Sequence, residues 1–202
     1  MKVIIVRHGQ TTENAKTQDV GHNSEALLTS EGVMQAQKLG RLLKSENILH
    51  AYSSPQQRAI HTAQEILAHH PKVILTHEPN LKEQSLGIYE DAPKHVWKQV
   101  RTESKDPYHL FKPEGGESYA QVQARAAGFF KDLAKKHPND TVLVVSHGVT
   151  TSLLLMHLFG KEINEENYKA YKPENTAFTV VEISDKGEVR PQKVNSLEHL
   201  NN

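Results

Sequence analysis

Short apolar runs without polar alternation recur along the chain and predict buried strands. The first covers residues 2–6, and further runs cover residues 51–52, 73–75, 142–145 and 178–183. A β-branched run with no polar alternation is typical of a strand that is buried on both faces of a parallel sheet. We therefore expect a central sheet that is mainly parallel.

Segments with a helical period lie between these runs. Residues 29–43 place their apolar side chains on one stripe, and Thr29 stands where an N-cap is expected. Ser54 and Pro55 predict the start of a helix that reaches about residue 68. The helical pattern returns over residues 118–135 and 150–158. Because strands alternate with helices, we predict the α/β fold class, as a three-layer sandwich in which helices flank the sheet.

Residues 84–116 do not follow this alternation. They contain Pro93, Pro107 and Pro113 and show little periodicity. We interpret them as an insertion, or lid, over the sheet edge of a single domain that covers residues 1–202. Two further expectations concern the C-terminal end of the chain. The tail from residue 197 is expected to be loose, and the run 178–183 is expected at an edge of the sheet, with the oligomeric state undetermined.

Composition excludes several classes of protein. The 202 residues carry 24 Lys plus Arg and 24 Asp plus Glu, so the formal net charge is zero and no nucleic-acid partner is expected. The absence of Cys excludes disulfides, thiolate zinc sites and cysteine nucleophiles. The first apolar run is too short for a signal peptide, and polar residues interrupt the uncharged stretch 142–159. We therefore expect a cytoplasmic protein with no membrane partner.

Candidate chemistry gathers where the predicted strands end. Arg7, His8 and Gly9 come directly after the first run, and His147 follows the run 142–145. Ligands of open α/β sheets bind beyond the carboxyl ends of the strands, so the two His would lie side by side if these strands are neighbours. Arg58 lies in the first turn of a predicted helix, where backbone N–H groups and a guanidinium favour phosphate. Each residue alone fits an ordinary structural or surface role. The two His at matching strand ends, taken together with Arg58 at a helix start, favour a phosphate-binding site.

Five blocks of sequence then match one known family in its own order. These blocks are Arg7-His8-Gly9-Gln10-Thr11 with Asn14, the run from Ser53-Ser54-Pro55 through Arg58 to Thr62-Ala63, Leu81-Lys82-Glu83, Gly115-Gly116-Glu117-Ser118, and Ser146-His147-Gly148. The chain resembles the histidine phosphatase superfamily, and most of all its phosphoglycerate-mutase-like branch. Within that branch it is similar to broad-specificity bacterial phosphatases, and the resemblance implies the phosphoglycerate-mutase-like fold.

The resemblance also implies roles for individual residues. It makes His8 the nucleophile that takes the phosphoryl group and Glu83 the proton donor to the leaving group. The predicted catalytic set is completed by Arg7, Arg58 and His147, and the predicted substrate-binding set comprises Arg7, Gln10, Asn14, Arg58, His147 and Gly148. No metal site and no cofactor are expected, because such a cationic cage can replace a metal ion.

The expected function is hydrolysis of a phosphomonoester, a small phosphorylated metabolite, through a covalent phosphohistidine intermediate on His8. The alternative is a cofactor-dependent phosphoglycerate mutase. Mutases of this family typically carry a Tyr-Gly after the catalytic Glu motif and paired arginines in the insertion, whereas this chain has Ser85-Leu86-Gly87 and a lone Arg101.

Two other classes stay open. A non-catalytic phosphate-binding module needs neither a nucleophile nor an acid, and a metal-dependent hydrolase needs ligand spacings such as HExxH that the chain lacks. The lid also carries a local basic surplus, from Lys94, Lys98, Arg101, Lys105 and Lys112. This surplus either attracts substrates with more than one anionic group or forms an ordinary solvated surface.

Overall fold

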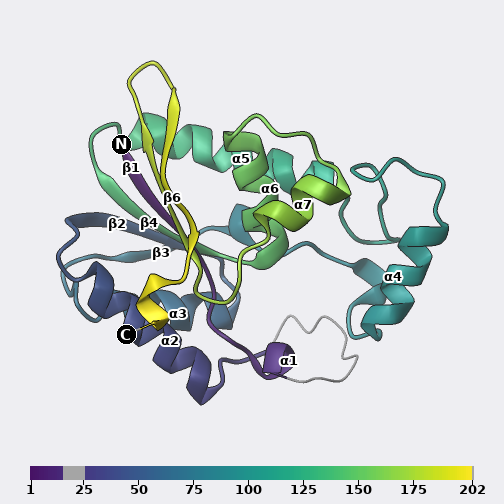
Figure 1. Cartoon of the computed structure of the whole chain (residues 1–202), viewed down its shortest axis with the longest axis horizontal. Coiled ribbons are helices and arrows are strands. Elements are labelled where there is room, and N and C mark those ends of the chain that lie inside the picture. The colour runs from purple at the N-terminus through teal and green to yellow at the C-terminus, as the bar shows by residue number, and fades with distance from the viewer. Residues whose placement is uncertain (16–25, 202) are drawn as a thin grey trace.

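A mixed sheet forms the centre of the computed structural model, which describes residues 1–15 and 26–201. In this described part, six strands pair in the order β3-β2-β4-β1-β5-β6 (Figure 1). β3, β2, β4 and β1 run parallel, whereas β5 and β6 are antiparallel to their neighbours. The strands are β1 (Lys2–Arg7), β2 (Ile48–Ser53), β3 (Leu75–His77), β4 (Thr141–Ser146), β5 (Phe178–Ile183) and β6 (Val189–Ser196). The predicted mainly parallel α/β sandwich is confirmed.

Helices cover both faces of this sheet. α2 and α3 lie on one face and α5 and α6 on the other (Figure 1). The helices are α1 (Thr12–Ala15), α2 (Ser30–Leu43), α3 (Gln57–Leu67), α4 (Lys94–Glu103), α5 (Tyr119–Lys136), α6 (Gly148–Leu158) and α7 (Glu165–Tyr171). Short 3-10 turns cover Pro79–Leu81, Gly87–Tyr89 and Glu198–Leu200. None of the helices in the described residues is long and apolar enough to cross a membrane.

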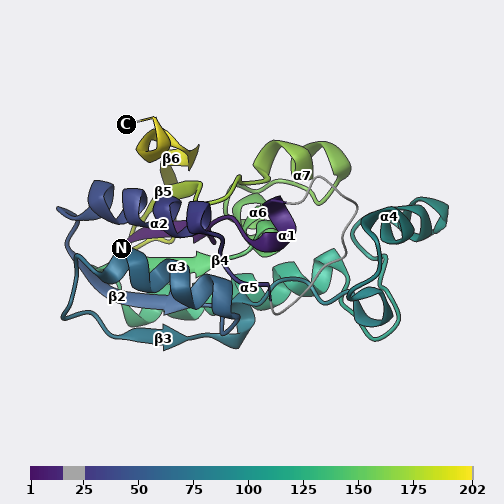
Figure 2. The ribbon, with the colours of Figure 1, turned by 90° about the horizontal axis from the view of Figure 1, so that it is seen from below.

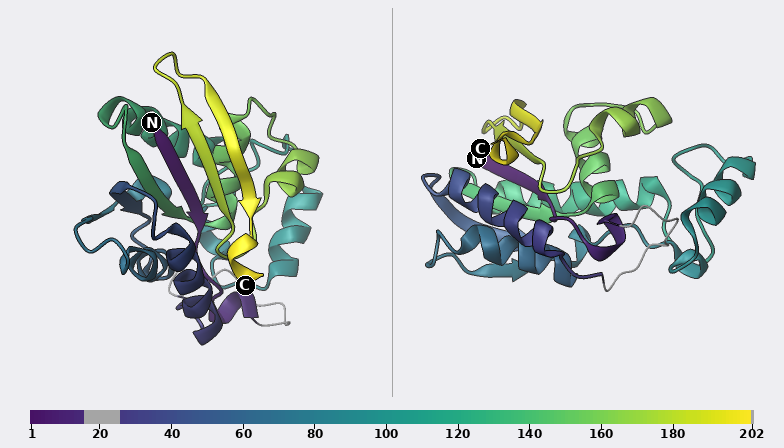
Figure 3. Two further views of the ribbon diagram at one scale, coloured as in Figure 1. Left: turned by 60° about the vertical axis from the view of Figure 1, so that its left-hand side comes forward. Right: turned by 60° about the horizontal axis from the view of Figure 1, so that its bottom comes forward.

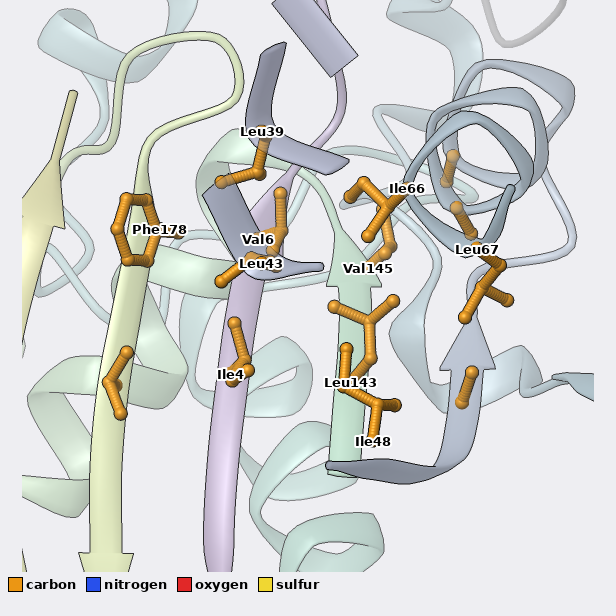
Figure 4. Packing of buried hydrophobic residues seen from close by; sticks show 14 residues of the cluster. Ile4, Val6, Leu39, Leu43, Ile48, Ile66, Leu67, Leu143, Val145 and Phe178 are labelled. Carbon is orange, nitrogen blue, oxygen red and sulfur yellow. The ribbon is translucent and has the colours of Figure 1, made fainter. Parts of the chain in front are cut away.

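Alternate residues of β1 build the two cores. Ile4 and Val6 pack with α2 and α3, and Val3 and Ile5 pack with α5 and α6. Figure 4 shows the first of these clusters, in which side chains from α2 and α3 rest on β1, β4 and β5. Burying each aliphatic side chain contributes about 1.5–3 kcal/mol, so the central strands are held rigidly and the residues at their ends are placed with them.

Side-chain caps begin two of the predicted helices. Thr29 accepts a hydrogen bond from the backbone N–H of Gly32, and Ser118 accepts one from Gln121 at the start of α5. The predicted start of α3 at Ser54 is wrong. Gln56 is still extended, with φ −75° and ψ 133°, because the Ser54 hydroxyl accepts the Gln56 N–H in a turn before the helix.

The C-terminal part of the chain corrects two expectations. β5 is not an edge strand, because β6 pairs with its outer side. β6 is largely exposed and contains Pro191 and Lys193, so it lacks the apolar alternation by which strands are found. Residues 197–201 of the tail are not loose either, and residue 202 lies outside the described part. The tail forms a 3-10 turn that buries His199, whose Nε2 lies 2.9 Å from the Thr176 hydroxyl.

This buried imidazole predicts an acid-sensitive contribution to stability. Burial lowers the pKa of His199 from 6.5 to about 4. Between these values the unfolded chain binds a proton that the folded chain excludes, so the free energy of unfolding falls as the pH falls from 6.5 to 4. Relative to His199→Gln, which does not titrate, the wild type should lose about 2 kcal/mol between pH 7 and pH 4. Urea denaturation of both proteins at both pH values measures this, and parallel pH profiles would contradict it.

The lid insertion projects beyond the carboxyl ends of the parallel strands (Figures 2 and 3). It does not lie over the sheet edge, as the sequence had suggested, and it contains α4. Its two ends are joined at the base, where the N–H of Ile88 donates to the carbonyl of Glu114 at 3.0 Å. A Cβ on Gly87 would lie 1.9 Å from the same carbonyl, and Gly87 has a φ of +56°, so only glycine allows the ends to approach so closely.

Candidate active site

A cavity of about 390 Å³ opens at the carboxyl ends of the parallel strands. This is where ligands of open α/β sheets bind, and its volume suits a small molecule. The residues that line it come from β1, α1, α3, α5, α6, α7, the lid and the loops between them. They are Arg7, His8, Thr11, Glu13, Asn14, Ala26, Arg58, Glu83, Gln84, Leu86, Ala92, Trp97, Lys98, Arg101, Tyr119, Gly148, Val149, Tyr168 and Lys172.

His8 follows β1 and is only 4% exposed. Its backbone N–H donates to the carbonyl of Ser146 at 2.9 Å, and its ring Nδ1 lies 2.8 Å from the carbonyl of Gly9. Because a carbonyl oxygen only accepts, Nδ1 must carry the ring proton and Nε2 the lone pair. A Cβ on Gly9 would lie 2.5 Å from the carbonyl of Gly32, so glycine is required where this turn meets α2.

His147 stands where β4 passes into α6, and its side chain is fully buried. Because β1 and β4 are neighbours in the sheet, its ring centroid lies 5.1 Å from that of His8. Arg58, from the first turn of α3, donates from Nε to His147 Nδ1 at 3.2 Å. An Nδ1 that accepts places the ring proton on Nε2, so the neutral ring offers a donor there.

Arg7 ends β1 and is held by a hydrogen bond from Nη1 to the carbonyl of Pro173 at 2.8 Å. Burial lowers the pKa of Arg7, and the carboxylates of Glu83 and Glu174 oppose this change. A guanidinium remains protonated in proteins, so Arg7 supplies a permanent positive charge at the cavity.

Glu83 lies at the N-terminus of α6. Its two carboxylate oxygens accept the backbone N–H groups of Val149 and Thr150, each at 3.1 Å. These donors hold the carboxyl group in one orientation at the start of the helix. A Cβ on Gly148 would make only ordinary contacts, 3.5 Å from Arg7 Nε and 3.7 Å from Glu83 Oε2, so this backbone position lies between the two side chains.

Arg125 of α5 fixes the segment that carries Glu83. It donates to both carboxylate oxygens of Glu117, at 2.8 and 3.0 Å, and to the backbone carbonyl of Glu83 at 3.2 Å. Burial by itself raises the pKa of Glu117, but hydrogen bonds from Arg125 and the Ser85 N–H lower it overall. Arg125 could not be predicted from the sequence. Its partner Glu117 lies eight residues earlier, before the start of α5, and this spacing forms no recognisable motif.

The two predicted amides differ in position. Asn14 lines the cavity, and its Oδ1 accepts from the side chain of Asn175 at 3.0 Å. Gln10 is turned away, because its Oε1 accepts from the Thr29 hydroxyl at 2.8 Å at the start of α2. Six of the eight predicted site residues therefore line the cavity. His147 is fully buried beside the His8 ring, and Gln10 is not among the residues that line the cavity.

The lid supplies one wall of the cavity through α4. Of its basic residues, Lys98 and Arg101 line the cavity, whereas Lys105 and Lys112 do not, and the side chain of Lys94 is outside the described part. The Arg101 guanidinium lies 4.2 Å from the ring centroid of Tyr119 and donates to its hydroxyl at 2.6 Å. Arg101 is therefore anchored to α5 and joins the lid to the body of the protein.

A further wall comes from α7, which the sequence analysis did not find. Tyr168 of this helix stacks on Tyr119, with ring centroids 5.1 Å apart, and burial raises the pKa of Tyr168. A signal for the helix was present in the chain. Asn164 caps it by accepting the N–H of Asn167, and two acidic residues occupy the first turn.

Comparisons with known proteins identify relatives along almost the whole chain. The family model described as the histidine phosphatase superfamily (branch 1) matches residues 3–196. The Arabidopsis thaliana phosphoglycerate mutase-like protein 4 is 33% identical over 153 residues. That match covers 73% of this chain and 66% of the plant protein, so the chain spans slightly less than two thirds of that relative.

Other relatives match over most of their length. Phosphoserine phosphatase 1 of Hydrogenobacter thermophilus is 29% identical over 197 residues, which cover 94% of this chain and 90% of that protein. The solved structure of Bacillus stearothermophilus YhfR superposes with a TM-score of 0.87 at 24% identity, over 98% of each chain. This likeness shows a common fold.

Proposed function

The chain belongs to branch 1 of the histidine phosphatase superfamily, and on this premise we propose that it is a phosphomonoester hydrolase that works through a phosphohistidine on His8. The observation that carries the proposal is the hydrogen bond between His8 Nδ1 and the Gly9 carbonyl. It places the lone pair on Nε2, the atom that must attack phosphorus. Around this ring stand Arg7, Arg58 and His147, which offer donors to phosphate oxygens.

In the first half of the reaction, Nε2 of His8 attacks the phosphorus atom of the substrate. The bond from phosphorus to the ester oxygen breaks as the new P–N bond forms. Glu83 gives its proton to the departing alkoxide, which leaves as an alcohol. Arg7, Arg58 and the Nε2–H of His147 stabilise the charge on the three transferred oxygens, and we therefore propose that the reaction requires no cofactor.

In the second half, a water molecule attacks the phosphohistidine. Glu83, now ionised, accepts a proton from this water, and the P–N bond breaks to release inorganic phosphate and restore His8. The hydrogen bonds from Val149 and Thr150 hold the Glu83 carboxylate in place for both proton transfers.

The cavity supports a small phosphorylated metabolite as substrate. Its volume of about 390 Å³ fits a compact molecule, and Trp97 and Lys98 of the lid face the part that would hold the leaving group. Lys98 offers a positive charge to a second anionic group, such as a carboxylate. The name of the Hydrogenobacter relative, a phosphoserine phosphatase, agrees with a phosphate ester that also carries a carboxylate.

A panel of phosphate esters tests this function. The protein is assayed in excess chelator with an aryl phosphate, phosphoserine, and 3-phosphoglycerate with and without 2,3-bisphosphoglycerate. We expect release of inorganic phosphate that persists in chelator and little isomerisation. Isomerisation of 3-phosphoglycerate that exceeds phosphate release and depends on the bisphosphate would establish the mutase alternative. Turnover that disappears in chelator and returns with a metal ion would favour a metal-dependent hydrolase.

A further inference from the structure

A second group of polar side chains lies at the opposite end of the sheet from the cavity. It consists of His50 on β2, His137 at the C-terminus of α5, and Asp140 just before β4. One ligand-type atom from each residue lies within 4.8 Å of the other two. In Figure 1 this is the corner beside the N-terminus, where α5 passes into β4. Among the described residues, this is the one such group of three.

A β-bulge in β2 brings His50 into this group. Ile48 pairs with Thr141 and His50 with Val142 of β4, so a step of two residues along β2 matches a step of one residue along β4. Ile48 and Ala51 can therefore both face α2 and α3, while His50 lies on the same face as Tyr52, against α5. A regular strand would have placed His50 in the core on the other side.

The distances suit a shared metal ion. His50 Nε2 and His137 Nδ1 lie 3.1 and 3.4 Å from the same oxygen, Oδ2 of Asp140. Ligands of a tetrahedral zinc ion with bonds of 2.0–2.2 Å are about 3.3 Å apart. We propose that His50, His137 and Asp140 bind one divalent transition-metal ion such as Zn²⁺, with water as the fourth ligand.

Contacts around the group orient His137 for this role. Its other ring nitrogen, Nε2, lies 2.9 Å from the Tyr52 hydroxyl, which also accepts from Lys136 at 3.2 Å. A proton on Nε2 that is donated to Tyr52 leaves the Nδ1 lone pair directed at Asp140. The C-terminus of α5 also places partial negative charge beside a bound cation, which favours its binding.

The proposed ion would link β2, the end of α5 and the start of β4, and it has no part in the phosphate chemistry. The parallel pairing of β1 with β4 runs from Lys2 opposite Thr141 to Arg7 opposite Ser146. Asp140 lies at the first of these ends and His8 at the second, so the two sites are separated by the length of a strand. Metal binding should therefore raise stability and leave the proposed hydrolysis unchanged, and neither proposal depends on the other.

Metal content and thermal stability test the proposal on the whole chain. The protein is stripped with chelator, dialysed against Zn²⁺, and analysed for bound zinc and for Tm. We expect the wild type to hold one equivalent of zinc more than His50→Ala and Asp140→Asn, and Zn²⁺ to raise Tm in the wild type only. His50 and Asp140 are partly exposed, so both variants should fold. Co²⁺ should give the strong visible absorption of a tetrahedral site in the wild type alone.

His61→Ala provides the matched control. His61 is an exposed histidine with its own carboxylate partner, Glu65, at 3.2 Å, and it lies outside the group. This variant should bind zinc as the wild type does. Zinc that binds at His8 and His147 would appear equally in every variant and would not contribute to the expected difference. Equal zinc content and equal Tm shifts in the wild type and His50→Ala would overturn the proposal.

Discussion

Replacing His8 by Ala should reduce kcat for an aryl phosphate by at least about four orders of magnitude, because the variant has no atom that can form the covalent intermediate. The hydrogen bonds from Arg7 to the Pro173 carbonyl and from Arg58 to His147 do not require the His8 ring, so these donors should remain in the variant. The affinity for inorganic phosphate should therefore change far less than kcat. Steady-state kinetics and phosphate inhibition measure the two effects separately.

Two further measurements make the His8→Ala result specific. Wild type that is mixed with labelled substrate and denatured in alkali should retain an acid-labile phosphoryl label, and the variant should retain none. His61→Ala, which changes an exposed histidine of α3, should keep full activity. Turnover by His8→Ala within about tenfold of the wild type would remove His8 from the mechanism and with it the proposed function.

Replacing Glu83 by Gln should have the second largest effect, and its size should depend on the leaving group. An alkoxide leaves only with a proton, so kcat/KM for phosphoserine should fall by about 10²–10⁴-fold. A 4-nitrophenolate leaves without one, so kcat/KM for its phosphate ester should fall much less. The ratio of the two kcat/KM values is the measurement, because kcat/KM covers the steps up to loss of the leaving group and omits the later hydrolysis of the phosphohistidine, in which Glu83 is the proposed base for both esters. A general disturbance of the site would lower both values alike.

Glu78→Gln is the matched control for Glu83→Gln. Glu78 precedes the 3-10 turn Pro79–Leu81, which lies just before Glu83 in the chain, and caps it by accepting the Asn80 N–H. It is half-buried and does not line the cavity. Its replacement should leave the ratio of the two kcat/KM values unchanged. Equal losses with both esters in Glu83→Gln would mean that Glu83 positions α6 and donates no proton.

Much of the fold could be predicted because its signals are local. The run 2–6 has no polar alternation, and it forms a strand whose residues are buried on both faces. Thr29 and Ser118 cap the helices that were predicted for them. The elements that were missed lack such a pattern. β6 is exposed along most of its length, and the tail is held by contacts with residues distant in the chain, such as those of His199 with Thr176 and Phe178.

The residues of the candidate site also differ in the signal by which the sequence revealed them. Arg7, His8 and His147 were found because each lies at the carboxyl end of a strand that the sequence marks as buried. Arg58 was found from its place in the first turn of a predicted helix, and it lines the cavity. The family motif added Glu83, Asn14 and Gly148, which line the cavity, and Gln10, which does not. A motif identifies a residue type at a position, but it does not say which neighbour that side chain will contact.

The sequence by itself determined the alternation of strands and helices, the positions of the two histidines and the family, because burial period and motif spacing are properties of consecutive residues. Only the tertiary structure decided what those residues touch. The register of β1 with β4 sets the two rings 5.1 Å apart, the Gly9 carbonyl accepts from Nδ1 of His8, and the start of α6 orients Glu83. The group of His50, His137 and Asp140 likewise depends on a bulge and a helix end, since long-range pairing brings together residues that are ninety positions apart.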